Sequence, residues 1–196
     1  MIRSAIALML SVVGAALGGA YTAKLVLDNA VHLARAEVDG WTGSGDAGAT
    51  DADLWTRAAV AKVGLMALNK DEAVYFSRSE DQDGRPLLEN CAYRIAGSDF
   101  PARWWSLTVY ASDDYLARND DDAHSIDATR ASVNENGSFR ARLAPTRGDA
   151  ENWLSTRATG RALLLLRLYH PEFEPDEAVK VLALPRVELT GCDGEA

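Results

Sequence analysis

Histidine and cysteine are scarce in this 196-residue chain, which contains three and two of them respectively. Two thiols are too few for a disulfide-dense scaffold or a four-thiolate zinc site, and three scattered histidines leave little for a histidine-rich metal centre. Basic residues are also in the minority, because 20 Lys and Arg face 29 Asp and Glu, for a net charge of −9. A nucleic-acid-binding protein needs a basic face. The sequence therefore predicts no nucleic-acid partner.

Motifs of the common enzyme classes are missing as well. The sequence has no Gly-x-Ser-x-Gly nucleophile elbow, no glycine-rich phosphate loop and no His-x-x-x-His metal pair. His170, which precedes Pro171, is interpreted as structural. We therefore predict no catalytic residue, no metal and no cofactor, although missing motifs leave enzymatic activity an open question.

The longest apolar run lies at the amino terminus. Residues 4–23 contain no charged side chain, and a helix of about 20 residues spans the roughly 30 Å hydrocarbon core of a membrane. Two interpretations remain open: an uncleaved signal-anchor, or a signal peptide cleaved near residues 18–20, where small residues are found. The anchor is favoured because the helical pattern continues to about Val38. We therefore expect residues 1–38 to form a transmembrane signal-anchor helix and its extension.

The charges that flank this segment carry a weak orientation signal. Arg3 precedes it and Lys24 follows it, and Arg3 favours an amino terminus on the cytoplasmic side. The expected localisation is the inner membrane, crossed once, with the carboxy-terminal body in the periplasm. Gly14 and Gly18 form a small-xxx-small pattern that lets two helices approach closely. The expected partners are therefore the membrane and either an envelope protein or further copies of the chain.

The rest of the chain is composed like a globular domain, with 47% apolar and 25% charged residues overall. Residues 39–52 are rich in Gly, Ser, Thr and Asp, which is typical of a linker or an ordered loop. Apolar residues at helical spacing predict a helix over residues 54–68, with Asp53 as its N-cap. Alternating or apolar runs predict strands at residues 72–77, 91–95, 101–110, 125–133, 138–143, 161–169 and 181–187. This series of short strands predicts a mainly β, jelly-roll-like β-sandwich over residues 53–196.

Several motifs follow one another in a characteristic order. They are Glu72-Ala73-Val74-Tyr75-Phe76, Asp83-Gly84-Arg85-Pro86-Leu87, Cys91-x-Tyr93-Arg94, residues 101–110, Asn152-Trp153-Leu154 and residues 166–171. The series resembles the domain of unknown function 1214 family over about residues 40–187. The resemblance implies a jelly-roll β-sandwich that often follows a single amino-terminal membrane helix, and it implies no particular activity. One departure is Ser155, where members of the family commonly have proline after Asn-Trp-Leu.

Tryptophans supply the first candidate binding residues. Trp104 and Trp105 are neighbours on a predicted strand, so they point to opposite faces of the sheet. One of them is expected in the core, and the other either packs as well or offers a flat apolar face to a sugar or a lipid. Trp153, which follows Asn152, either closes a structural corner with it or contributes to a ligand site.

A second group of candidates combines arginine with tyrosine. Arg167 and Tyr169 lie on the most apolar predicted strand, and Arg103 and Tyr110 lie near the two ends of residues 101–110. A buried arginine needs a carboxylate or several carbonyl groups. Arg103, Arg167 and Tyr110 therefore either take part in internal contacts or line a pocket for an acidic ligand.

The two cysteines, Cys91 and Cys192, are 101 positions apart (192 − 91). They form a disulfide if the body lies outside the cytoplasm and remain free thiols if it does not, and the disulfide is the expected state. The acidic stretch at residues 113–127 matches no EF-hand spacing and is interpreted as a solvated loop.

Two hypotheses for the function follow from these features. The favoured one is a non-catalytic interaction or assembly module, anchored in the membrane and facing the periplasm. The alternative is a carbohydrate- or lipid-binding module, or a hydrolase, that acts on envelope material, and it rests on fold analogy alone. An apolar patch with a polar rim favours the first, whereas a concave pocket with converging polar groups favours the second.

Overall fold

The computed structural model describes residues 2–33, 36–43, 53–62, 68–69, 71–173 and 182–193. The helices among them are α1 (Ile2–Leu33) and α2 (Leu54–Lys62). The strands are β1 (Ala36–Val38), β2 (Trp41–Gly43), β3 (Ala73–Arg78), β4 (Cys91–Gly97), β5 (Ala102–Tyr110), β6 (Ser125–Asp127), β7 (Phe139–Ala144), β8 (Asn152–Ser155), β9 (Leu163–Pro171) and β10 (Arg186–Cys192).

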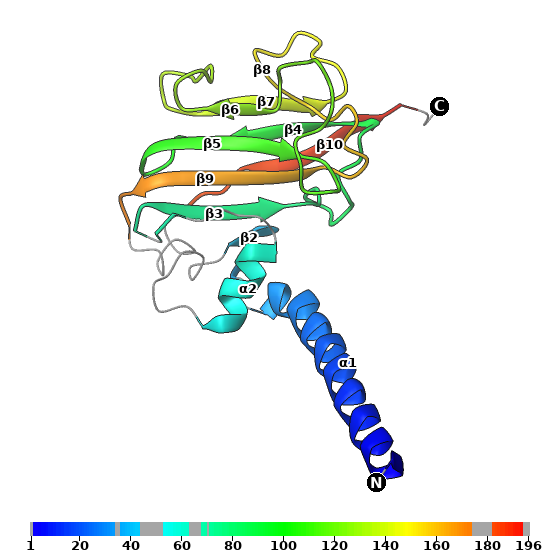
Figure 1. Cartoon of the computed structure of the whole chain (residues 1–196). Helices are drawn as coiled ribbons and strands as arrows, with labels where there is room; N and C mark the ends of the chain where they lie inside the picture. The colour runs from blue at the N-terminus through cyan, green and yellow to red at the C-terminus, as the bar shows by residue number, and fades with distance from the viewer. Residues whose placement is uncertain are drawn as a thin grey trace.

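The strands form two sheets that pack face to face, so the fold is a mainly β sandwich preceded by an apolar helix. One sheet has the order β1-β2-β3-β9-β5-β6 and the other the order β10-β4-β7-β8. Figure 1 shows β3, β5 and β9 in front of β4 and β10. The described strand pairs are antiparallel except for β7 and β8, which are parallel. The jelly-roll connectivity stays a prediction.

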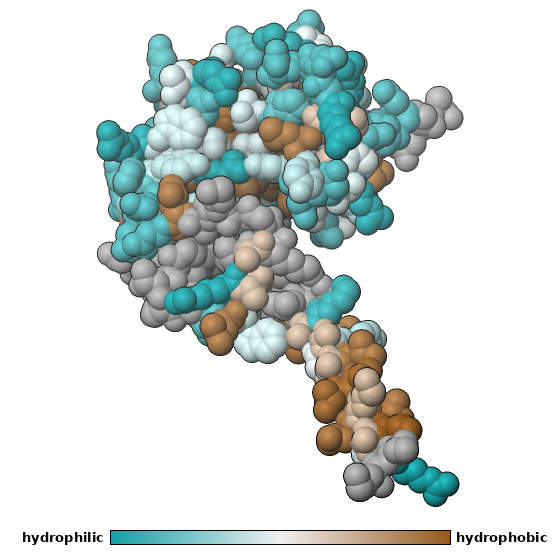
Figure 2. Space-filling model, in the orientation of Figure 1, coloured by the Kyte–Doolittle hydropathy of each residue, from teal (hydrophilic) through white to brown (hydrophobic). Residues whose placement is uncertain are grey.

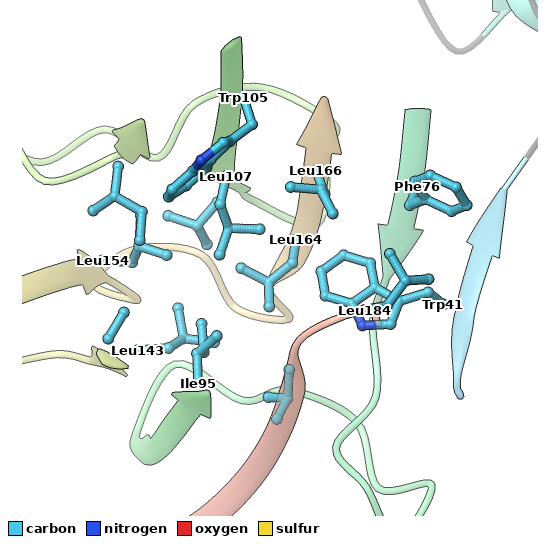
Figure 3. Packing of buried hydrophobic residues seen from close by; sticks show 14 of the residues in the cluster. Trp41, Phe76, Ile95, Trp105, Leu107, Leu143, Leu154, Leu164, Leu166 and Leu184 are labelled. Carbon is cyan, nitrogen blue, oxygen red and sulfur yellow. The ribbon is translucent and has the colours of Figure 1, made fainter. Parts of the chain in front are cut away.

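The core lies between the two sheets because alternate side chains on each strand point inward. Leu166 and Trp105 come from the first sheet, and Ile95 and Leu143 come from the second; each of them is buried. Figure 3 shows their side chains converging in the layer between the sheets. Trp105 also stacks on Phe139, with the ring centroids 5.0 Å apart. Large apolar side chains from both sheets therefore exclude water from one continuous core.

A hairpin, formed by β1 and β2, follows the amino-terminal helix. α1 ends at Leu33, so the helical pattern expected as far as Val38 stops earlier, and Val38 lies in β1 instead. Asp39 and Gly40 connect β1 to β2 with φ angles of 51° and 78°. Two successive positive φ angles are typical of the two-residue turn that matches the twist of a hairpin.

The hairpin is fastened to the core of the sandwich. Trp41 is fully buried, and its indole Nε1 donates a hydrogen bond to the carbonyl oxygen of Pro185 over 2.7 Å. The buried guanidinium of Arg78 lies over the Trp41 ring and donates to the carbonyl oxygens of Asp39 and Asp81. Burial lowers the pKa of Arg78, and the negative charge of Asp81 partly offsets this effect. Part of the expected linker is therefore packed into the sandwich.

The helix that follows begins where the sequence predicts it. The backbone N–H of Trp55 donates to Oδ1 of Asp53 over 2.7 Å, which is the contact of an N-cap residue. α2 is described as far as Lys62. Residues 63–67 of the expected helix lie outside the described residues, and Leu68 is not helical.

Two strands differ in extent from the sequence prediction. The strand expected at residues 125–133 is β6, which ends at Asp127 because this carboxylate accepts two backbone N–H groups and turns the chain. The strand expected at residues 181–187 is β10, which begins after Pro185 and lies at the edge of its sheet. Proline has no N–H to donate, so it is excluded from the interior of a ladder.

A disulfide joins β4 to β10. Cys91 and Cys192 are directly opposite each other in the pairing of the two strands, and their sulfur atoms are bonded. The bond fixes the last strand of the chain to the second sheet. Disulfides persist in oxidising compartments, so this bond is compatible with a body outside the cytoplasm.

α1 is long and apolar enough to cross a membrane. Its apolar segment, Arg3–Val26, has 24 residues, and none of it is buried against the rest of the chain. At 1.5 Å per residue this segment is about 36 Å long. Figure 1 shows α1 running away from the sandwich, and Figure 2 shows its hydrophobic surface. A membrane anchor and a signal sequence share these properties.

Candidate binding surface

The outer face of the six-stranded sheet carries the aromatic and arginine side chains that the sequence singles out. Strand alternation places Trp104 and Tyr110 of β5 on this face, and the same rule places Arg167 and Tyr169 of β9 beside them. The pairing of β5 with β9 sets Trp104 opposite Tyr169. We call these four residues the aromatic strip.

Trp104 and Tyr169 form one end of the aromatic strip. Their ring centroids are 5.3 Å apart, and the rings are tilted by 54°. The indole Nε1 of Trp104 donates a hydrogen bond to the hydroxyl of Thr129 over 3.0 Å. Both rings are partly exposed. The pair therefore offers a fixed apolar surface to a second molecule.

Arg167 and Tyr110 form the other end. Nη1 of Arg167 donates to the hydroxyl of Thr108 over 3.1 Å, and Nη2 donates to the hydroxyl of Tyr110. The guanidinium also lies 5.7 Å from the centre of the Tyr110 ring, within cation–π range. Arg167 is partly buried. These contacts hold a positive charge at a defined place on the sheet.

Asp127 builds the turn that presents Thr129 to Trp104. Its carboxylate accepts the backbone N–H of Thr129 and Nε of Arg130, at 2.9 and 2.7 Å. Burial alone would raise the pKa of Asp127, but the hydrogen bonds from Arg130 and Thr129 outweigh it and lower this pKa. Asp127 is therefore ionised at neutral pH, and its carboxylate stabilises the turn that contains Thr129 and Arg130.

The chain itself covers the β3 side of the face. Tyr75 of β3 is buried, and its hydroxyl accepts the backbone N–H of Leu68 over 3.1 Å. Tyr75 packs with Ala73 and Leu165, and Tyr169 packs against this cluster. Burial raises the pKa of Tyr169, although the charge of Arg167 acts in the opposite direction. Each residue of the aromatic strip keeps part of its surface exposed on this face.

The surface around the aromatic strip is polar. Figure 2 shows pale, near-neutral surface where Figure 1 places β5 and β9, with hydrophilic surface around much of it. Pale surface in this colouring is typical of Trp, Tyr, Ser and Thr. The strip follows a sheet face, and its four residues do not line the groove on the second sheet that is described below.

Three further candidates lie elsewhere. Trp105 is in the core, with 2% of its surface exposed. Asn152 accepts the N–H of Ser132 and donates to backbone carbonyl groups, so its amide is used to hold the chain. Trp153 donates to the carbonyl oxygen of Ala144. Asn152 and Trp153 belong to β8, in the other sheet, and do not join the aromatic strip.

Arg103 does not join the strip either. It lies exposed near the start of β5 and, within the described part of the chain, forms no hydrogen bond or ion pair with Arg167 or Tyr110. Alternation along β5 directs positions 103 and 110 to opposite sides of the sheet. Of the three residues expected to meet across neighbouring strands, Arg167 and Tyr110 therefore do so.

A groove of about 470 Å³ lies on the second sheet and is a concave candidate separate from the aromatic strip. Its lining includes Arg94, Arg140, Arg142, Asp149, Glu151 and Asn152. Arg94 is paired with Glu188 at 2.6 Å, and Nε of Arg142 donates to the carbonyl oxygen of Thr146. Because opposite charges line the same groove and two arginines are already engaged, it is a weaker candidate than the aromatic strip.

The acidic loop between β5 and β6 is held by its own contacts. Asp121 accepts the hydroxyl of Ser155 over 2.6 Å and Nε of Arg157 over 3.0 Å. Among the residues that the structure describes, no group of three or more His, Cys, Asp or Glu side chains is arranged to hold a metal ion. The loop therefore contributes no candidate site.

Comparison with known protein families identifies the family of the chain. Residues 72–173 match the family described as "Protein of unknown function (DUF1214)". The chain belongs to this family. The match covers β3 to β9 and therefore includes every residue of the aromatic strip.

Solved structures show what the DUF1214 chain resembles in three dimensions. The VPA0106 protein from Vibrio parahaemolyticus is 21% identical, with a TM-score of 0.58 over 72% of this chain and 36% of that one. An uncharacterized protein from Burkholderia cenocepacia is 18% identical, with a TM-score of 0.47 over 60% of this chain and 29% of that one. The DUF1214 chain thus spans about a third of the length of these proteins. The first likeness supports the fold alone. No curated protein matches the chain.

Three residues that contact the aromatic strip of this DUF1214 domain were not predicted from the sequence. Thr108 and Thr129 anchor Arg167 and Trp104, and Tyr75 connects the face to Leu68. The alternation of residues 101–110 already places Thr108 on the face of Trp104 and Tyr110. The sequence carries no comparable signal for Thr129 and Tyr75, because their roles depend on a turn and on strand order.

Proposed function

We propose that this protein is a single-pass membrane-anchored module on the periplasmic side, and that it acts without catalysis by binding a protein partner through the aromatic strip. Three features support the proposal. α1 has the length of a membrane span, the disulfide suits an oxidising compartment, and the aromatic strip leaves Trp104, Tyr110 and Tyr169 partly exposed around Arg167.

The composition of the strip is the observation that carries this function. Trp, Tyr and Arg are the residues in which the binding energy of protein interfaces concentrates. In the strip they are held in place by Thr129 and Thr108 before any partner arrives. A side chain that is already ordered loses less conformational entropy on binding. An open sheet face suits an extended macromolecular surface better than a small ligand, which needs a concave site.

The test is purification of the tagged full-length protein from native membranes in mild detergent, with mass spectrometry of what co-purifies. We expect a stoichiometric protein partner with the wild type, and recovery at least tenfold lower with the double variant Trp104→Ala/Tyr169→Ala. Tyr115→Ala is the matched control, because Tyr115 is an exposed aromatic residue outside the strip, with 74% of its surface accessible.

Two results would contradict the proposal. One is a wild-type protein that is isolated alone. The other is a partner whose recovery is the same with the double variant as with the wild type. Thermal melting of each variant shows whether the fold is intact.

A glycan is the second candidate ligand, and the Trp104–Tyr169 ring pair favours it. Exposed aromatic rings stack on the apolar faces of sugars. This alternative predicts that an envelope glycan raises the melting temperature of the wild type and leaves that of Trp104→Ala unchanged. Failure of every member of a glycan panel to stabilise the wild type would remove it.

A further inference from the structure

Arg167 differs in its surroundings from the ion-paired arginines of the described residues. Four other arginines, Arg85, Arg94, Arg130 and Arg157, form ion pairs with carboxylates and have side chains that are 51–67% exposed. Arg167 is more buried than these, and within the described ranges no carboxylate lies within 4.0 Å of it. Its side-chain partners are the neutral hydroxyls of Thr108 and Tyr110.

An acidic residue lies near in the sheet but is already engaged. Strand pairing sets Ser106 opposite both Arg167 and Asp127, so the three share one row of the outer face. The carboxylate of Asp127 is occupied by Arg130 and by the backbone of its own turn. The fold therefore supplies Arg167 with no internal counter-ion from this row.

The guanidinium retains capacity for a further ligand. It has five N–H donors in a planar fork, and the described contacts use one from Nη1 and one from Nη2. The hydroxyl of Tyr110 accepts from Arg167, so its own hydrogen is available for a second acceptor. A partly desolvated arginine forms stronger, charge-assisted hydrogen bonds with a carboxylate than with a neutral group.

The two ends of the strip together define the ligand. A carboxylate can accept hydrogen bonds from Arg167 at one end, and an apolar or planar side chain can pack on the Trp104 and Tyr169 rings at the other. We infer that the aromatic strip binds an acidic segment of the protein partner, with an Asp or Glu carboxylate on Arg167 and a neighbouring apolar side chain on Trp104 and Tyr169. The inference rests on the proposed function and specifies the chemistry of the partner.

The test uses the full-length protein in mild detergent on an array of twelve-residue peptides. Each peptide is present twice, once with Asp and Glu and once with Asn and Gln at the same positions. We expect the wild type to retain the acidic versions at least tenfold more strongly than their amide versions. Arg167→Gln should reduce this preference to less than twofold, and Arg167→Lys, which keeps the charge but loses the fork, should reduce it in part.

Arg103→Gln is the matched control, since it removes the same charge from the same sheet at an exposed position outside the strip. It should retain the full preference. Equal retention of acidic and amide peptides by the wild type would overturn the inference, and so would retention of neither, a preference that survives in folded Arg167→Gln, or specific binding of an acidic oligosaccharide in place of the peptides. Thermal melting establishes that each variant is folded.

The failure of this inference is distinguishable from the failure of the proposed function. A partner whose capture depends on Trp104 and Tyr169, but whose binding shows no preference for acidic peptides, leaves the proposed function in place and removes the inference. A partner whose capture is independent of the strip removes both.

Discussion

Trp41 attaches the amino-terminal hairpin to the core of the sandwich. It is fully buried, and its N–H satisfies the buried carbonyl group of Pro185. Arg78 covers the ring and holds the turn that precedes it. A tryptophan in such a place combines a large apolar area with one required hydrogen bond.

Replacement of Trp41 by alanine should lower the free energy of unfolding by about 3–5 kcal/mol, because it leaves a large cavity and an unpaired carbonyl oxygen. Urea denaturation followed by circular dichroism measures the change. Trp55→Ala removes an exposed tryptophan from α2 and should change the stability by less than about 1 kcal/mol. Equal effects of the two substitutions would show that the hairpin is not fastened as described.

Asp127 links pH to the order of the aromatic strip. Its pKa is lowered in the folded protein, so its ionised form stabilises the fold at a pH above the ordinary aspartate value of about 3.9. This contribution is lost as the pH falls from there through the lower pKa of the folded state. Asp127→Asn should therefore melt at a lower temperature than the wild type at neutral pH, and the difference should shrink on acidification.

Melting temperatures of both proteins between about pH 7 and pH 2.5 test this prediction. Asp149→Asn is the matched control, because it makes the same substitution at an exposed aspartate outside this turn. The difference in tryptophan fluorescence between each protein and its Trp104→Phe variant gives a second reading, since the turn of Asp127 presents Thr129 to Trp104. A difference in melting temperature that stays constant across the pH range would contradict the assigned role.

At the scale of elements, β10 depends on a covalent bond as well as on its ladder. It lies at the edge of its sheet and, among the described strands, pairs with β4. The Cys91–Cys192 bond closes a loop of about 100 residues. In the loop-entropy account a bond of this span stabilises the folded state by about 4–5 kcal/mol, chiefly by restricting the unfolded chain.

Cys192→Ser should therefore lower the unfolding free energy by up to about that amount. Reduction of the wild type should have a similar effect, whereas the reductant should leave the variant unchanged. Chemical denaturation with and without reductant measures both. A wild type whose stability does not respond to complete reduction would contradict this account.

Elements differ in how far the sequence predicts them, and the reasons are physical. The strand at residues 101–110 is predicted almost to the residue because its alternation is strong, and the assignment of Trp104 and Trp105 to opposite faces is confirmed. β1 and β2 are missed because three-residue strands carry little periodicity. The Asp39-Gly40 pair is a hairpin signal that would have revealed them.

The candidate site is likewise predicted from the sequence only in part. The residue types and the face of β5 are readable from the sequence. The meeting of Arg167 with Tyr110 and the separation of both from Asn152 depend on which strands are neighbours and in which sheet. Sequence separation carries no information on that order, since β5 and β9 pair across more than fifty intervening residues.

At the scale of the whole molecule, the proposed topology makes a direct prediction. Alkaline phosphatase fused to the carboxy terminus should be active, and a green fluorescent protein fused there should remain dark, because the first folds only outside the cytoplasm and the second only within it. Deletion of residues 2–26 should reverse both readings. A fluorescent carboxy-terminal fusion to the full-length chain would place the body in the cytoplasm.

The short connection between α1 and the β1–β2 hairpin limits how far the sandwich can lie from a membrane that holds α1. The helix rises about 10 Å from Val26 to Leu33, and the step from Leu33 to Ala36 adds at most about 10 Å. If Arg3–Val26 spans the membrane, Ala36, where the hairpin begins, therefore lies within about 20 Å of the end of the membrane-spanning segment. The proposed anchor would therefore keep the sandwich next to the bilayer, so the proposed partner must be a membrane protein or a protein that binds close to the membrane surface.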